Sequence, residues 1–182
     1  MKLHRPLAAM ALSALAACEQ PPAAKPAELG FKPVASLQEL MLAVIDPNID
    51  FVWNSVASIT STEGEQERRP TKPEDWEAVR QHALVVAEAA NLLLIDRPVA
   101  KGSINTASGG AELSALAIHN LIQANREQFQ QRAVALQDAS RQLLAAIDQQ
   151  NADELERAGG VVEQACEQCH SQFWYPGDKR PK

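Results

Sequence analysis

The sequence has few aromatic residues and no dense basic segment. Phe, Trp and Tyr together make up 4% of its 182 residues, which is low for the core of a single domain. Lys and Arg number 17 against 23 Asp and Glu, for a net charge of −6, and they form no cluster. Because nucleic-acid binding needs basic clusters that replace counterions around phosphates, a nucleic-acid partner is excluded. The acidity favours a basic or neutral partner.

Long hydrophobic runs, alternating strand patterns and internal repeats are also missing. After residue 17, no apolar run is long enough to span a bilayer. Apolar residues recur instead at intervals of three and four over 37–59, 76–94, 129–147 and 155–173. This spacing predicts an all-α chain of four principal amphipathic helices, which implies an antiparallel four-helix bundle.

The first residues predict export. Lys2 and Arg5 precede an apolar stretch at 7–17 that is too short to cross a membrane, as in a signal peptide. The sequence Leu15-Ala16-Ala17-Cys18 resembles a bacterial lipobox, in which cleavage leaves a lipid-bearing cysteine at the new N-terminus. We therefore predict a signal peptide at 1–17 and lipidation of Cys18. The alternative is an ordinary signal peptide cut near the same place.

A proline-rich segment follows the predicted cleavage point. Residues 18–35 contain four prolines among alanines and charges, which is typical of an extended tether. Removal of 1–17 takes away two basic side chains and no acid, so the net charge becomes −8. We expect a folded domain at 36–177 and a short tail at 178–182.

Helix boundaries are marked by capping and breaking residues. Ser36-Leu37-Gln38-Glu39 is a capping box, and Pro47 requires a kink or restart farther along that helix. Thr71-Lys72-Pro73-Glu74 is a second capping signal, and the stretch 61–73 before it is expected to be an exposed loop. A helix over all of 111–149 would be too long for the domain, so we predict a break within 120–126. Asn151 or Asp153 caps the last helix.

The most informative motif is Cys166-Glu167-Gln168-Cys169-His170. Cys-x-x-Cys-His is the pattern by which a chain is covalently attached to haem. On a helix, positions i, i+3 and i+4 share a face, so two thiols can meet the two vinyl groups while the imidazole reaches the iron. One covalently attached haem c is therefore predicted, and it would supply the apolar bulk that the aromatic residues do not.

Two other uses of this motif fit less well. Structural zinc needs four ligands, but the only other cysteine is Cys18, and no remaining histidine stands at a ligand spacing. His82 and His119 are expected to be boundary histidines with ordinary hydrogen bonds. A thioredoxin-like motif needs a βαβ setting, whereas the surrounding pattern is helical.

Export, four helices and Cys166-x-x-Cys169-His170-x-x-Phe173 near the C-terminus together resemble the cytochrome c′ and cytochrome c-556 family, the class II c-type cytochromes. The resemblance implies thioether bonds at Cys166 and Cys169, and His170 as the proximal iron ligand. The motif would lie on the C-terminal helix. It also implies a periplasmic protein, here anchored to a membrane of undetermined identity through Cys18.

The family differs in what occupies the sixth iron position. In one branch a methionine from the first helix binds the iron, and Met41 stands at the matching place. In the other branch an apolar lid admits only small gases, and here Leu37, Leu40 or Val44 would form it. The family commonly follows its motif aromatic residue with Arg or Lys, whereas this chain has Trp174.

Three functions remain open at this stage. The first is a one-electron carrier with His/Met-ligated iron and an unidentified redox partner protein. The second is a five-coordinate haem protein that binds nitric oxide or carbon monoxide. The third is a haem-free helical lipoprotein that serves as a scaffold or metal-binding module. No acid/base pair or nucleophile is evident, so we predict no enzymatic activity. Members of the resembled family often form homodimers through helix faces, and the sequence leaves this possibility open.

Overall fold

The computed structural model of the protein describes residues 30–62, 64–101 and 111–177. The chain divides into two compact units, Met1–Gly30 and Phe31–Lys182, and the described elements all belong to the second. The predicted signal peptide, the Cys18 anchor, most of the predicted tether and the tail lie outside the described residues.

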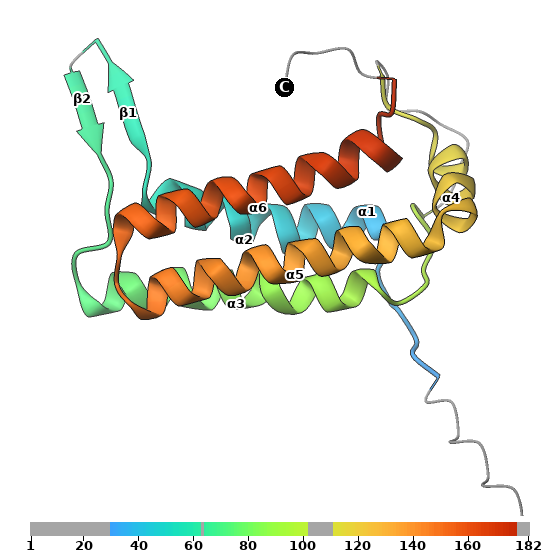
Figure 1. Ribbon diagram of the computed structural model, residues 1–182, viewed down its shortest axis with the longest axis horizontal. Coiled ribbons are helices and arrows are strands. Elements are labelled where there is room, and N and C mark those ends of the chain that lie inside the picture. Colours follow the sequence, from blue (N-terminus) through green and yellow to red (C-terminus); the bar gives the residue numbers. More distant parts are fainter. Residues whose placement is uncertain (1–29, 63, 102–110, 178–182) are drawn as a thin grey trace, which may run out of the picture. The chain divides into compact units, whose positions relative to one another are not determined.

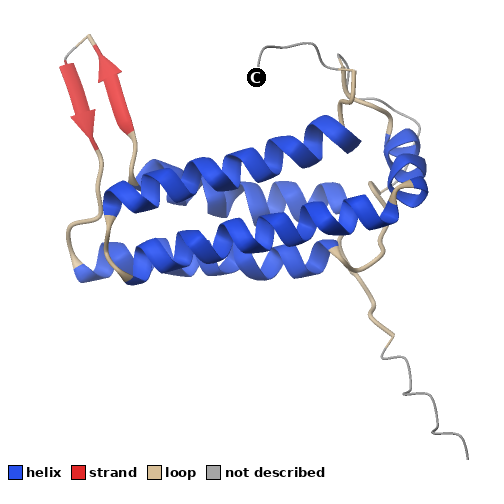
Figure 2. Ribbon diagram, in the orientation of Figure 1, coloured by secondary structure: helices blue, strands red, loops and turns tan. Residues whose placement is uncertain are grey.

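The described part of the second unit is mostly helical (Figure 2), which confirms the all-α prediction. Its only strands form one small hairpin. In chain order the elements are α1 (Leu37–Leu40), the π-helical turn η1 (Met41–Ile45), α2 (Asp46–Ser55), β1 (Ser58–Ser61), β2 (Gly64–Glu67), α3 (Pro73–Leu93), α4 (Ala115–Ala124), α5 (Arg126–Asp148) and α6 (Ala152–Phe173).

The long helices lie side by side around one core. α1, η1 and α2 run end to end as a single helical segment beside α3, α5 and α6 (Figure 1). α5 packs against both α3 and α6, and α2 packs against α3 and α6. Each contributes fully buried side chains; these include Leu40, Val52, Val79, Val86, Leu143, Leu155, Val162 and Phe173. The apolar stripes read from the sequence therefore face one another.

The predicted capping box at the first helix is present. The Ser36 hydroxyl accepts a hydrogen bond from the Glu39 N–H (3.2 Å), and a Glu39 carboxylate oxygen accepts one from the Ser36 N–H (2.9 Å). Lys101 adds an ion pair to the other carboxylate oxygen, with Nζ 2.8 Å from Oε1. Together, the Lys101 ammonium and the Ser36 donors lower the pKa of the Glu39 carboxyl from 4.5 to about 2.

This arrangement predicts a pH-dependent contribution to stability. Because the pKa of Glu39 is lower in the folded chain than in the unfolded one, its stabilisation is present above pH 4.5 and is lost as the pH falls toward 2. We expect Glu39→Gln to lower stability at pH 6 and to have little effect near pH 2. Urea unfolding of both proteins across this pH range measures the difference. Equal sensitivity at both pH values would contradict the assignment.

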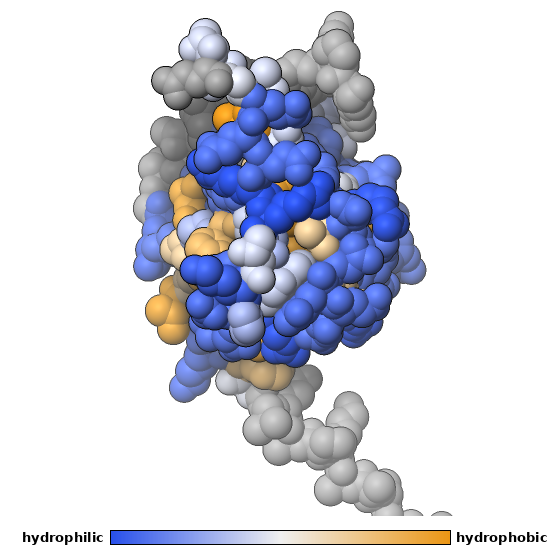
Figure 3. All heavy atoms as spheres, turned by 90° about the vertical axis from the view of Figure 1, so that its left-hand side faces the viewer, coloured by the Kyte–Doolittle hydropathy of each residue, from blue (hydrophilic) through white to orange (hydrophobic). Residues whose placement is uncertain are grey.

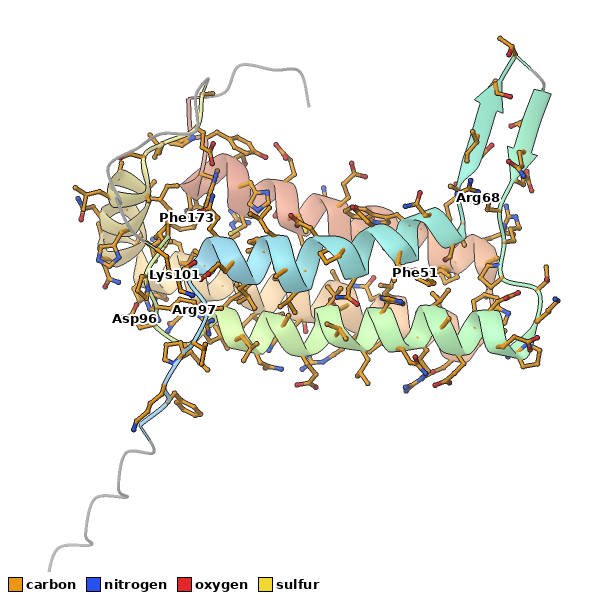
Figure 4. All side chains as sticks on the ribbon, turned by 180° about the vertical axis from the view of Figure 1, so that it is seen from behind. Phe51, Arg68, Asp96, Arg97, Lys101 and Phe173 are labelled. Carbon is orange, nitrogen blue, oxygen red and sulfur yellow. The ribbon has the colours of Figure 1, made fainter. Side chains whose placement is uncertain are left out.

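The segment after α3 holds the start of α1 in place. The N–H groups of Leu37 and Gln38 donate to the carbonyls of Pro98 and Val99 at 2.8 and 2.9 Å. Arg97 donates to the Ala35 carbonyl. Figure 4 shows Arg97 and Lys101 together at this end of the helices. The first helix therefore enters the core at a fixed position.

The irregularity expected at Pro47 takes the form of a π turn just before it. Pro47 lies in the first turn of α2, where its missing N–H costs little. The preceding Asp46 N–H donates to the Met41 carbonyl, five residues back. The helix thus continues without a break, and Met41 is the first residue of the widened turn. Single π turns occur frequently at functional sites.

The expected helix up to Ile59 and the expected loop from residue 61 are wrong in part. α2 ends at Ser55, and Ile59 lies in β1, which pairs antiparallel with β2. The sequence Ser58-Ile59-Thr60-Ser61 has β-branched residues that favour a strand. Gly64 begins β2 with φ 124°, a conformation that side chains disfavour. The apolar spacing predicts that Ile59 continues the helix, but in the structure the backbone of this segment pairs with β2 instead.

The capping prediction for α3 is also corrected. Its N-cap is Lys72 rather than Thr71, with Pro73 in the first turn. The Asp75 carboxylate accepts hydrogen bonds from the N–H groups of Thr71 (3.2 Å) and Lys72 (3.1 Å). A carboxylate in the first turn therefore takes the role that the sequence pattern assigned to a threonine hydroxyl.

The later helix boundaries agree with the sequence. The break predicted within 120–126 falls at Asn125, whose φ and ψ of −130° and 41° are not helical. Asn151 caps α6 by accepting the Glu154 N–H at 3.1 Å. Only residues 149–151 join α5 to α6, so these two neighbours run in opposite directions.

α2 is fastened to α6 by Trp53. Its indole N–H donates to the Gly159 carbonyl at 3.1 Å. A Cβ on residue 159 would lie 3.1 Å from Cδ1 of the indole, so any larger residue would need the indole to shift by a few tenths of an ångström. The contact joins the first and last long helices two turns before the Cys-x-x-Cys-His motif.

Most of the visible surface is polar. Figure 3 views the end of the helices beside the hairpin, and hydrophilic residues cover most of it. Within the described ranges, no helix combines the length and the apolar character needed to cross a bilayer.

Candidate functional site

The motif lies on the last two turns of α6 and borders a cavity of about 780 Å³. This volume falls within the range of ordinary cofactor and ligand pockets. The motif residues Cys166, Cys169 and His170 all line it. The wall is completed by η1, α2, the end of α3, and α5; its apolar members include Met41, Ile45, Ile49, Trp53, Leu93, Phe129 and Leu136.

The two cysteines of the motif occupy partly buried positions and form no disulfide with each other. Burial raises the pKa of Cys166 to about 11 and that of Cys169 to about 12. Both are therefore protonated at neutral pH. A thioredoxin-like dithiol needs the opposite shift, since its attacking cysteine depends on a lowered pKa. The apolar setting of the thiols argues against a redox-active dithiol.

The imidazole of His170 lies in the same wall. Burial lowers the pKa of His170, and the nearby Asp46 and Glu167 carboxylates act against this shift. The neutral imidazole, which is the form that binds metal, is thus favoured at neutral pH. Partial burial also raises the pKa of the Asp46 carboxyl, which the His170 charge opposes.

Met41 borders the cavity from the first helical segment. The widened turn that begins at Met41 places Ile45 and Ile49 in the wall beside it. The three residues expected to form the alternative apolar lid, Leu37, Leu40 and Val44, do not line this cavity. Any apolar closure on this side therefore involves Ile45 and Ile49.

The residues present fit a haem c group. Two thiols and one imidazole stand at i, i+3 and i+4 on one helix, and the remaining wall is largely aliphatic and aromatic. Zinc fits poorly, because within the described ranges no three His, Cys, Asp or Glu residues gather as a metal cluster. The donor set and the cavity together favour a large planar cofactor.

Arg132 on α5 was not identified from the sequence. It lines the cavity and donates from Nε to Gln172 at 2.9 Å and from Nη1 to Gln168 at 2.8 Å. It thus brings a guanidinium beside the motif from another helix, although the residue directly after Phe173 is Trp174 and not Arg or Lys. Its spacing of three from Phe129 places it beside the apolar stripe of α5, but the sequence does not tell which helix that stripe meets.

The described histidines outside the motif do not line this cavity. The Nδ1 of His82 lies 2.7 Å from the Asn48 side-chain oxygen, and its ring stacks on Phe51 at 3.9 Å. Figure 4 shows Phe51 on α2, beside α3. This is the ordinary boundary role predicted for His82. His119 lies partly buried on α4.

Comparison with known proteins identifies the family. A family model described as "Cytochrome C'" matches residues 69–174, which include α3 to α6 and the whole motif, but not Met41. Searches of curated proteins and of solved structures gave no match. Proteins of this family are typically exported or periplasmic, and they bind haem c covalently. The match spans more than half of the sequence, so this chain is a class II c-type cytochrome of the cytochrome c′ family and carries covalently attached haem c.

Proposed function

We propose that this protein is a periplasmic mono-haem cytochrome that carries single electrons. Its domain would be an antiparallel four-helix bundle formed by α1–η1–α2, α3, α5 and α6. Cys166 and Cys169 would form the two thioether bonds, and His170 and Met41 would be the axial ligands of the iron. The observation that carries the proposal is that Met41 and the three motif residues border one cavity, although they come from the first and last helical segments.

His/Met ligation suits an electron carrier. Methionine sulfur stabilises the ferrous state, and an apolar surrounding has the same effect, so both raise the reduction potential. The aliphatic wall beside Met41, including Ile45 and Ile49, provides such a surrounding. When both axial ligands stay bound in the ferric and ferrous states, the geometry of the iron site changes little on electron transfer. Such a site leaves no open coordination position for substrate chemistry, and we propose no enzymatic activity.

Gas binding is the second candidate function. If the Met41 sulfur does not bind the iron, the sixth position would face the apolar wall formed by Met41, Ile45 and Ile49. A small diatomic gas could enter such a site. This candidate is favoured by Ile45 and Ile49, which give the cavity an apolar wall beside Met41.

Absorption spectroscopy of the haem-loaded protein separates the two. We expect low-spin spectra in both oxidation states and slow, incomplete binding of carbon monoxide to the ferrous protein at neutral pH. A high-spin resting spectrum with rapid carbon monoxide binding would instead establish the five-coordinate gas-binding function.

The cellular setting follows from the N-terminal sequence. We propose that Cys18 bears lipid and anchors the protein to a membrane, with 18–35 as the tether. The excess of acidic over basic side chains fits a redox partner with a basic or neutral docking surface. Mass spectrometry of the mature N-terminus tests the lipid: an unmodified Cys18 would exclude the anchor.

A further inference from the structure

The geometry points to Tyr175 as a positioning residue for the proximal imidazole, with its phenol ring fixed against the cavity by Glu167. This inference rests on the proposed role of His170 as an iron ligand. It concerns two side chains that take no part in attaching the haem. Glu167 is the first variable residue of Cys-x-x-Cys-His, and Tyr175 lies beyond the end of the helix.

The backbone after α6 turns back toward His170. The N–H groups of Trp174 and Tyr175 both donate to the His170 carbonyl, at 2.8 and 3.0 Å. Phe173, just before them, is buried and meets Phe129 of α5 edge-on, with ring centroids 5.4 Å apart. The Trp174 carbonyl accepts the Leu113 N–H at 2.9 Å. The main chain at Tyr175 is therefore held from three sides.

The Tyr175 side chain is fixed at its other end as well. Its hydroxyl donates to a carboxylate oxygen of Glu167 at 2.7 Å, the length expected for a charge-assisted hydrogen bond. Glu167 lies three residues before His170, so both project from the same face of α6. The phenol ring bridges this face, with its centroid 6.0 Å from that of the imidazole and its plane inclined at 60°.

The ring also forms part of the cavity wall. Tyr175 and Glu167 both line the cavity that His170 borders. Trp174 has a similar distance to His170, with centroids 6.4 Å apart, but it does not line the cavity, and its indole N–H is bonded to Glu112. Of the two aromatic residues after Phe173, Tyr175 alone has its ring in the wall.

A ring held at both ends has two consequences for the imidazole. It restricts rotation of the His170 ring, and partners that orient a ligating histidine tune the metal. It also keeps water from this side of the cavity, which favours the less charged ferrous state and raises the reduction potential. Loss of the Glu167 bond frees the phenol to turn away and weakens both effects.

The test compares Tyr175→Phe and Tyr175→Ala with Trp174→Phe, in haem-loaded protein. Trp174→Phe is the matched control, because it removes one hydrogen bond from an adjacent aromatic residue that lies outside the cavity wall. We measure the reduction potential and, by proton NMR of the ferric protein, the pattern of the four haem methyl shifts, which reports imidazole orientation. We expect a lower potential and an altered pattern in Tyr175→Phe, larger changes in Tyr175→Ala, and wild-type values in Trp174→Phe.

Glu167 provides an independent pair of variants. Glu167→Gln keeps an acceptor for the phenol and should keep the methyl pattern, whereas Glu167→Ala should reproduce the pattern of Tyr175→Phe. A wild-type pattern and potential in Tyr175→Phe, or equal changes in Trp174→Phe, would overturn the inference. If Tyr175→Ala does not fold or incorporate haem, Tyr175→Phe still tests the inference. The absorption spectrum of the wild-type protein and its reaction with carbon monoxide test the proposed function separately, since a high-spin spectrum with rapid carbon monoxide binding would overturn that function whatever the Tyr175 variants show.

Discussion

Replacing Cys166 and Cys169 together with alanine abolishes covalent haem attachment, which is the largest effect that we expect. Thioether bonds survive denaturation, whereas haem held only by ligation and packing does not. The double variant should therefore give no haem stain on a denaturing gel, and its C-terminal peptide should have an unmodified mass. The single variants each keep one thiol and should retain one thioether, with reduced haem content.

Cys18→Ala is the matched control for the cysteine variants. It removes the one cysteine outside the haem motif, which the proposal assigns to lipid rather than to haem. Its haem content should equal that of the wild type. Haem stain in the double variant, or its loss in Cys18→Ala, would show that the cysteines have other roles than those proposed.

The helices and most of their ends could be predicted because the signals are local. The capping box at Ser36, the break now placed at Asn125 and the Asn151 cap each depend on residues within one turn of the boundary. The haem motif is equally local, since its three residues share a face of one helix. Family membership then follows from the motif together with its position in the last helix.

The hairpin and the π turn could not be predicted because their signals compete with stronger helical ones. Ile59 continues the apolar spacing of α2, and only strand pairing with Gln66 reveals another structure. Pro47 indicates an irregularity, but the choice between a kink and a π turn depends on how η1 packs against α3. Such choices depend on tertiary contacts.

The remaining wall of the site is set by contacts between distant residues. Arg132 reaches Gln168 and Gln172 across 36 and 40 residues of sequence. Trp53 reaches the Gly159 carbonyl across 106. An arginine at position 132 or a tryptophan at position 53 does not by itself indicate which residue it will contact. The sequence thus predicts the attachment of the cofactor and singles out Met41, which lines the cavity, but it does not predict the contacts between helices that complete the wall.

Met41→Ala should convert the iron from six-coordinate low spin to five-coordinate high spin. Alanine cannot reach the metal, so the ferrous variant should bind carbon monoxide rapidly. With the proposed Met41 ligand in place, carbon monoxide would first have to displace the methionine sulfur, and each 1.4 kcal/mol of that iron–sulfur bond would weaken gas binding about tenfold. We expect a gain in carbon monoxide affinity of at least about tenfold, with a lower reduction potential because the sulfur ligand that favours ferrous iron is lost.

Leu42→Ala is the control for this substitution. Leu42 follows Met41 in the same π turn, but its side chain is 64% exposed and does not line the cavity. It should keep the wild-type spectrum and affinity, which separates ligand loss from local loosening of η1. If Met41→Ala also keeps the wild-type spectrum, Met41 only packs in the wall, as methionines commonly do. If that shared spectrum is high spin, the apolar residues Ile45 and Ile49 would border the distal side, and the protein would bind gases rather than carry electrons.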